Sequence, residues 1–185
     1  MMKRREFITL IGGVAVAPTV LLLVAARAQQ AKVYTIGVLA LTTPNPEPLV
    51  KALRDGLRDA GYVEGRNLRL EIRTADGRPN LQSENAAELV RLKVDLIVTF
   101  FTPTALAAKQ ATSEIPIVMA GAGDPVATGL VASFARPGGN VTGLSSGGAE
   151  VAGKSVELIR ELKPSARRVG VLADEIDPFA ASYLA

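Results

Sequence analysis

Short apolar runs alternate with amphipathic segments along this chain, and the alternation limits the folds that it can adopt. Runs such as 33–40 and 95–100 carry mostly apolar residues, as expected of strands that are buried on both faces. Strands that alternate with helices predict a parallel sheet with helices on both of its faces. We expect strands at 33–40, 68–73, 95–100, 115–120 and 141–144, and helices at 46–60, 81–93, 102–110 and 129–135.

The expected fold class is therefore α/β, with a parallel Rossmann-like sheet. A flavodoxin-like strand order is the simplest topology that right-handed crossovers allow. Residues 68–73 alternate apolar with charged side chains, which is typical of a half-exposed strand near the edge of a sheet.

The composition excludes several common catalytic mechanisms, because the chain contains no cysteine and no histidine. Disulfides, thiolate nucleophiles and Ser-His-Asp catalysis are thereby excluded. Carboxylate chemistry survives, so a carboxylate-dependent α/β hydrolase is an alternative, with Asp76 and Asp124 as the acidic residues near strand ends. We expect a binding protein without catalytic residues, cofactor or metal.

The first 28 residues have the layout of a bacterial export signal. Arg4 and Arg5 precede an uncharged run at 7–26, and Ala26-Arg27-Ala28 supplies a small-x-small cleavage site. The paired arginines favour the twin-arginine route, and we expect cleavage after Ala28. The uncharged run has 20 residues, which is also enough to span a bilayer, so an uncleaved membrane anchor is the alternative.

The basic character of the chain comes from that segment. Residues 1–28 hold four of the 21 basic residues and one of the 18 acidic residues, which leaves 17 of each sign in the remainder. A neutral domain with charges of both signs gives no support for nucleic-acid binding, so we expect no nucleic-acid partner.

The C-terminal part is expected to begin a second structural unit. Residues 145–148 are expected to form a flexible crossover, and 150–162 have the pattern of an amphipathic helix. Residues 168–174 repeat the character of the first strand, so we expect them to open a second α/β lobe; extension of the first sheet is the alternative. The expected domains are a signal peptide at 1–28, a ligand-binding lobe at 33–145, and the hinge, helix and first strand of an incomplete second lobe at 146–185.

Three loops are expected at the carboxyl ends of the strands, where open parallel sheets bind their ligands. They contain Thr42, Thr102 with Thr104, and Asp124. Helix starts at the second and third loops would offer N–H groups to a carboxylate, and the threonine hydroxyls would add hydrogen bonds. Asp124 would pair with an ammonium group. Together these residues predict a site for an amino acid or a related zwitterion.

The same residues also have purely structural interpretations. Thr42 and Thr102 can cap helices, and Asp124 can belong to a turn. Phe100 and Phe101 are adjacent, so on a strand one faces the core and the other can reach the cleft; we expect both in the core.

Five sequence motifs occur together in one protein family. The chain closely resembles the substrate-binding proteins of ABC transporters that have the type I periplasmic-binding fold, in the subgroup related to tryptophan and tyrosine uptake. The resemblance covers residues 1 to about 178. The motifs are RREFITL at 4–10, ARAQQ at 26–30, GYVEGRNL at 61–68, GDPV at 123–126 and ARPGGNVTGL at 135–144.

The resemblance implies a periplasmic receptor with two Rossmann-like lobes that close on a small ligand. Its partner would be an ABC permease in the inner membrane, and we expect a monomer. Full members of the family have about twice this mature length, so we expect a truncated chain that lacks most of the second lobe. A membrane-anchored sensory ligand-binding domain is the alternative function.

Overall fold

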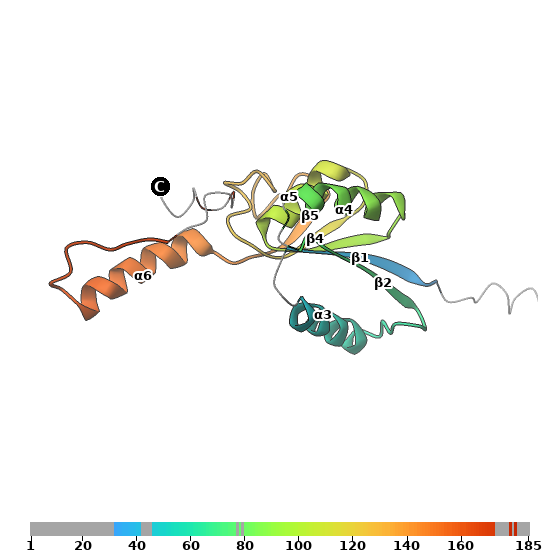
Figure 1. Ribbon diagram of the computed structural model, residues 1–185, viewed down its shortest axis with the longest axis horizontal. Coiled ribbons are helices and arrows are strands. Elements are labelled where there is room, and N and C mark those ends of the chain that lie inside the picture. Colours follow the sequence, from blue (N-terminus) through green and yellow to red (C-terminus); the bar gives the residue numbers. More distant parts are fainter. Residues whose placement is uncertain are drawn as a thin grey trace, which may run out of the picture. The chain divides into compact units, whose positions relative to one another are not determined.

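The protein is described by a computed structural model, which covers residues 32–41, 46–76, 78, 80–172, 178 and 180. Its described strands form one parallel sheet in the order β2-β1-β3-β4-β5 (Figure 1). This is the flavodoxin-like order, so the predicted topology is confirmed. The strands are β1 (Tyr34–Ala40), β2 (Leu68–Thr74), β3 (Leu96–Phe100), β4 (Ile117–Ala122) and β5 (Val141–Ser145).

Helices cover both faces of this sheet. Helix α3 (Glu47–Asp59) lies on one face, and α4 (Asn80–Arg91) with α5 (Thr102–Ala111) lies on the other (Figure 1). Strand β1 serves both cores, because its Val38 belongs to the α3-side cluster and its Leu39 to the cluster on the opposite face. Burial on both faces explains why residues 36–40 of this strand carry no polar side chain.

The helix expected at 129–135 is not formed. Residues 125–129 form a turn, and the chain from Leu130 to Asn140 contains no helix or strand. Gly129 has a φ of 71°, which interrupts a helical path, and the Lys109 ammonium donates to its carbonyl oxygen at 2.5 Å. Leu130 and Val131 are nevertheless buried in the core beside α5, so the apolar pattern reflected packing and not a helix.

The C-terminal prediction is confirmed for the helix and wrong for the described part of the strand. Helix α6 (Gly148–Leu162) occupies the predicted place. Residues 168–172 belong to no strand, and Val169 and Val171 are exposed. A strand requires a hydrogen-bonded neighbour, and within the described ranges this segment pairs with none. The structure describes no helix that is long and apolar enough to cross a membrane.

A bidentate ion pair joins the edge strand β2 to helix α4. Arg73 donates from Nε to Glu88 Oε2 at 3.0 Å and from Nη2 to Glu88 Oε1 at 2.8 Å. The hydrogen bonds from Arg73 hold the pKa of the Glu88 carboxyl below its usual value of about 4.5. Planar pairing of this kind is the strongest form of a side-chain ion pair.

Because of this ion pair, the stability of the fold depends on pH. A lowered pKa in the folded state means that the stabilisation is present at neutral pH and is lost as the pH falls below about 4.5. We expect Glu88→Gln to lower the melting temperature at neutral pH and to flatten its fall on acidification, measured by circular dichroism. Glu84→Gln, an exposed position on the same helix, is the matched control. Parallel pH profiles for Glu88→Gln and the unaltered protein would contradict this prediction.

Candidate functional site

The start of α5, the loop after β4 and the end of β5 are fastened to one another at the carboxyl edge of the sheet. The Gly123 N–H donates to Thr102 Oγ1 at 2.9 Å, which joins the loop after β4 to the start of α5. On the other side, the Ser145 hydroxyl donates to the Gly123 carbonyl oxygen at 2.8 Å. The backbone around Gly123 is therefore held from both sides, by α5 and by β5, as a preorganised site requires.

The two threonines of the second loop are both buried. Thr102 is 3% exposed, and its oxygen is occupied by the Gly123 N–H. Thr104 is 0% exposed, and its hydroxyl contacts the carbonyl oxygens of Phe100 and Phe101. Both side chains thus hold backbone in place, and the predicted ligand contacts of Thr102 and Thr104 stay predictions.

Asp124 is half-buried at the end of β4 and shapes the turn that follows it. Its Oδ1 accepts hydrogen bonds from the N–H groups of Val126 at 3.1 Å and Ala127 at 3.0 Å. The structural interpretation of Asp124 as a turn residue is thereby confirmed. Among the described residues none bonds the second carboxylate oxygen, so one residue can both cap the turn and retain a hydrogen-bond acceptor.

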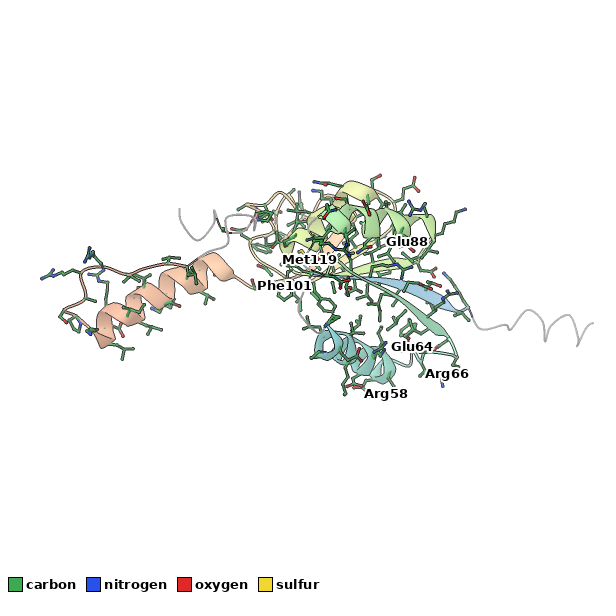
Figure 2. All side chains as sticks on the ribbon, in the orientation of Figure 1. Arg58, Glu64, Arg66, Glu88, Phe101 and Met119 are labelled. Carbon is green, nitrogen blue, oxygen red and sulfur yellow. The ribbon has the colours of Figure 1, made fainter. Side chains whose placement is uncertain are left out.

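The expectation that Phe100 and Phe101 both lie in the core is wrong for one of them. Phe100 is 6% exposed and belongs to the α3-side core, whereas Phe101 is 42% exposed. Phe101 lies just before α5, with φ 70° and ψ 165°. Figure 2 shows it at the carboxyl end of the sheet, the end opposite to Glu64 and Arg66. No periodicity in the sequence marks this change of direction.

Two serines were missed as parts of the site. Ser145 and Ser146 fall in the segment expected to be a flexible crossover, yet Ser145 ends β5 and the Ser146 N–H donates to the Ala122 carbonyl oxygen at 2.7 Å. The available signal was their position directly after the strand expected at 141–144, at the same edge of the sheet as Asp124. Thr42 lies outside the described residues.

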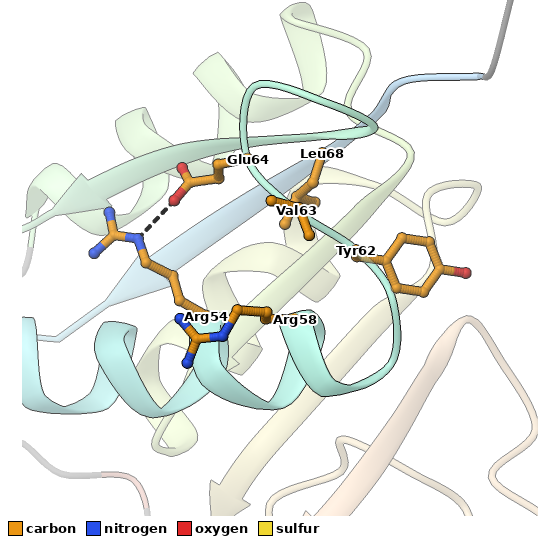
Figure 3. A pocket seen from close by; sticks show the side chains of 6 residues that line it. All are labelled: Arg54, Arg58, Tyr62, Val63, Glu64 and Leu68. Atoms are coloured by element: carbon orange, nitrogen blue, oxygen red, sulfur yellow. Dashed lines mark hydrogen bonds and ion pairs between the residues drawn. The ribbon is translucent and has the colours of Figure 1, made fainter.

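A separate cavity of about 170 Å³ lies beside the opposite end of β2. Figure 3 shows Arg54 and Glu64 facing each other across it, in an ion pair of 2.8 Å. Arg58 is likewise paired, with Asp55. The two arginines that line this cavity are thus already paired within the protein, so the carboxyl edge of the sheet is the better candidate for a ligand site. No group of side chains in the described ranges could hold a metal ion.

Comparison with known sequences identifies relatives. The profile of the family "ABC transporter substrate binding protein" matches residues 36–178. A tyrosine-binding protein of Clostridioides difficile (strain R20291) is 37% identical over 142 residues, which are 76% of this chain and 41% of that protein.

Solved structures give the same result. A conserved domain protein from Vibrio cholerae has a TM-score of 0.75 and 36% identity, over 83% of this chain and 51% of that one. An ABC domain in complex with L-Trp, from Streptococcus pneumonia, has a TM-score of 0.73 and 29% identity with the same coverage. The chain thus spans about half the length of these relatives. Its strand order and these likenesses confirm the lobe fold of type I periplasmic-binding proteins, and the chain belongs to the family of ABC transporter substrate-binding proteins.

Proposed function

We propose that this chain supplies the first lobe of an exported receptor that captures an amino acid or a related zwitterion for uptake by an ABC transporter. The fastened loops at the carboxyl edge of the sheet carry the proposal, because open parallel sheets bind small ligands there. The names of two relatives support an amino-acid ligand: one is a tyrosine-binding protein and another is solved with L-Trp. The protein then works by binding, without catalysis.

Each predicted residue receives a role in this proposal. Asp124 would accept a hydrogen bond from the ligand ammonium group through its second carboxylate oxygen. Thr102 would hold the loop that carries Asp124, and Thr104 would act through the backbone that it fixes. The N–H groups at the start of α5 would face the ligand carboxylate. Thr42, on the loop after β1, would add a hydroxyl group.

The remaining parts of the proposal concern the whole transporter. Residues 1–28 would direct export to the periplasm and be removed, and 33–145 would form the ligand-binding lobe. Residues 146–185 would begin the second lobe, which closes over the ligand. The receptor would act as a monomer and deliver its ligand to a permease in the inner membrane.

The charge of Asp124 provides the test. Asp124→Asn keeps an oxygen that can accept from Val126 and Ala127, so the turn survives, but it removes the negative charge. We expect Asp124→Asn to weaken amino-acid binding by about tenfold or more, since hydrogen bonds to charged groups are worth about 1.5–3 kcal/mol. Isothermal titration calorimetry with a panel of L-amino acids measures this change.

Two further variants separate binding from folding. Asp124→Ala removes both the charge and the turn acceptor, so it should lose binding and stability together. Glu114→Gln removes one negative charge from an exposed residue after α5, and it should leave binding unchanged. Equal affinities of Asp124→Asn and the unaltered protein would show that Asp124 is only a turn residue. A protein that binds none of the amino acids would overturn the proposed ligand class.

A further inference from the structure

Phe101 combines two unfavourable features at the carboxyl edge of the sheet. Its φ of 70° and ψ of 165° lie in a region that is essentially restricted to glycine. Its aromatic side chain is 42% exposed, although Phe100 beside it is buried. The other described non-glycine residues with positive φ are Asp76 and Lys93, which have polar side chains. A bulky aromatic residue tolerates this backbone least.

Neighbouring groups hold the strained backbone in place. The buried Thr104 hydroxyl contacts the carbonyl oxygens of Phe100 and Phe101, and the Ala105 N–H donates to the Phe101 carbonyl oxygen at 3.3 Å. Thr102, the next residue, is tied to Gly123. These bonds fix the direction in which the Phe101 side chain leaves the chain, so the ring is presented without reorganisation.

The neighbouring strand β4 leaves open space at Gly121, near its carboxyl end. Phe100 is in register with Ala120, so Phe101 and Gly121 are the residues that follow this pair along the chain. A Cβ atom built on Gly121 would meet nothing within 4 Å. This space lies next to the loop that carries Asp124 and leaves room for an apolar group of a ligand.

We propose that Phe101 is a specificity-determining residue, whose ring contacts the side chain of an aromatic amino acid bound at the carboxyl edge. The inference rests on the proposed function and adds the residue that would select for an aromatic side chain. Aromatic pairs gain energy beyond the area that they bury, so an aromatic side chain profits most from the ring. The backbone strain is maintained because it directs the ring to the ligand and away from the core.

Replacement by glycine separates strain from recognition. Phe101→Gly removes the ring and accepts the backbone conformation, so we expect a higher melting temperature together with weaker binding of L-tyrosine and L-tryptophan, by about tenfold. Phe101→Ala removes the ring but keeps a Cβ atom, so it should lose the same affinity without the gain in melting temperature. Binding of L-alanine, which lacks an aromatic ring, should change less than about twofold in either variant.

The outcomes are distinguishable in calorimetry and thermal melts of the full chain. A parallel loss of affinity for all three amino acids, or a lower melting temperature of Phe101→Gly, would assign the ring a merely structural role and overturn the inference. Unchanged affinities for L-tyrosine and L-tryptophan would also overturn it. If the unaltered protein binds no amino acid, the proposed function fails and the inference fails with it.

Discussion

Replacement of Gly143 by alanine is expected to destabilise the protein by about 3 kcal/mol or more. Gly143 lies in β5 opposite Met119 of β4, with a φ of 137°. A Cβ atom at this position would lie 2.1 Å from the Met119 carbonyl oxygen and 2.7 Å from the Met119 nitrogen. Both atoms belong to the backbone of β4, which pairs with β3 on one side and β5 on the other, so neither can move aside without disturbing the sheet.

The damage should extend to the site, because β5 carries the serine that holds the loop after β4. If β5 separates, the Ser145 hydroxyl loses the Gly123 carbonyl oxygen and the loop with Asp124 is released on one side. We therefore expect Gly143→Ala to lose both stability and ligand binding. Urea denaturation followed by circular dichroism is the suitable measurement, since the chain has no tryptophan to report by fluorescence.

A second glycine supplies a control of opposite sign. Gly56 lies in the exposed interior of α3, and a Cβ atom there would meet nothing within 4 Å. Gly56→Ala should stabilise the protein by about 0.5–1 kcal/mol, because alanine is the better helix former. A Gly143→Ala protein within about 1 kcal/mol of the unaltered one would show that the β4–β5 pairing is more adaptable than its geometry indicates.

The fold was predictable because its causes are local and repeated. Buried parallel strands must be apolar on both faces, and the alternation of charged with apolar residues in 68–73 marked the edge strand. The two elements that were predicted wrongly depend instead on contacts with other parts of the chain. At 129–135 the apolar residues pack against α5 without forming a helix, and at 168–172 no pairing partner is present among the described residues. Such contacts are not encoded in the segment itself.

The site was predictable in position but not in the roles of its residues. The topological rule directed attention to the loops that contain Thr102 and Asp124. It could not show that the Thr102 hydroxyl oxygen accepts from the Gly123 N–H, or that the serine at the end of β5 holds the loop after β4. Hydrogen bonds between residues about twenty positions apart depend on the register of the sheet, which a single sequence does not reveal.

Removal of the Leu89 side chain is the second substitution with a large expected effect. Leu89 is fully buried in the core between the sheet and helices α4 and α5. Its truncation to alanine leaves a cavity, so we expect Leu89→Ala to lower the free energy of unfolding by about 3 kcal/mol. Val50→Ala, at a buried position of α3 on the other face of the sheet, is the comparison variant.

Gly37 of β1 offers a way to refill that cavity. A Cβ atom on Gly37 would lie 3.0 Å from Leu89 Cδ1 and 3.1 Å from Cδ2, so Gly37→Ala alone overfills the core and should cost about 1 kcal/mol. In the Leu89→Ala background the same methyl group enters vacated space, and alanine restricts the unfolded chain more than glycine, so the substitution should become stabilising.

We expect a coupling energy of about 1–2 kcal/mol between Gly37 and Leu89, and additivity within about 0.5 kcal/mol for Gly37→Ala with Val50→Ala. Urea denaturation of the four proteins in each cycle measures both quantities. Equal coupling in the two cycles would mean that the effect of Gly37→Ala arises in the backbone of β1 and not in its packing against Leu89.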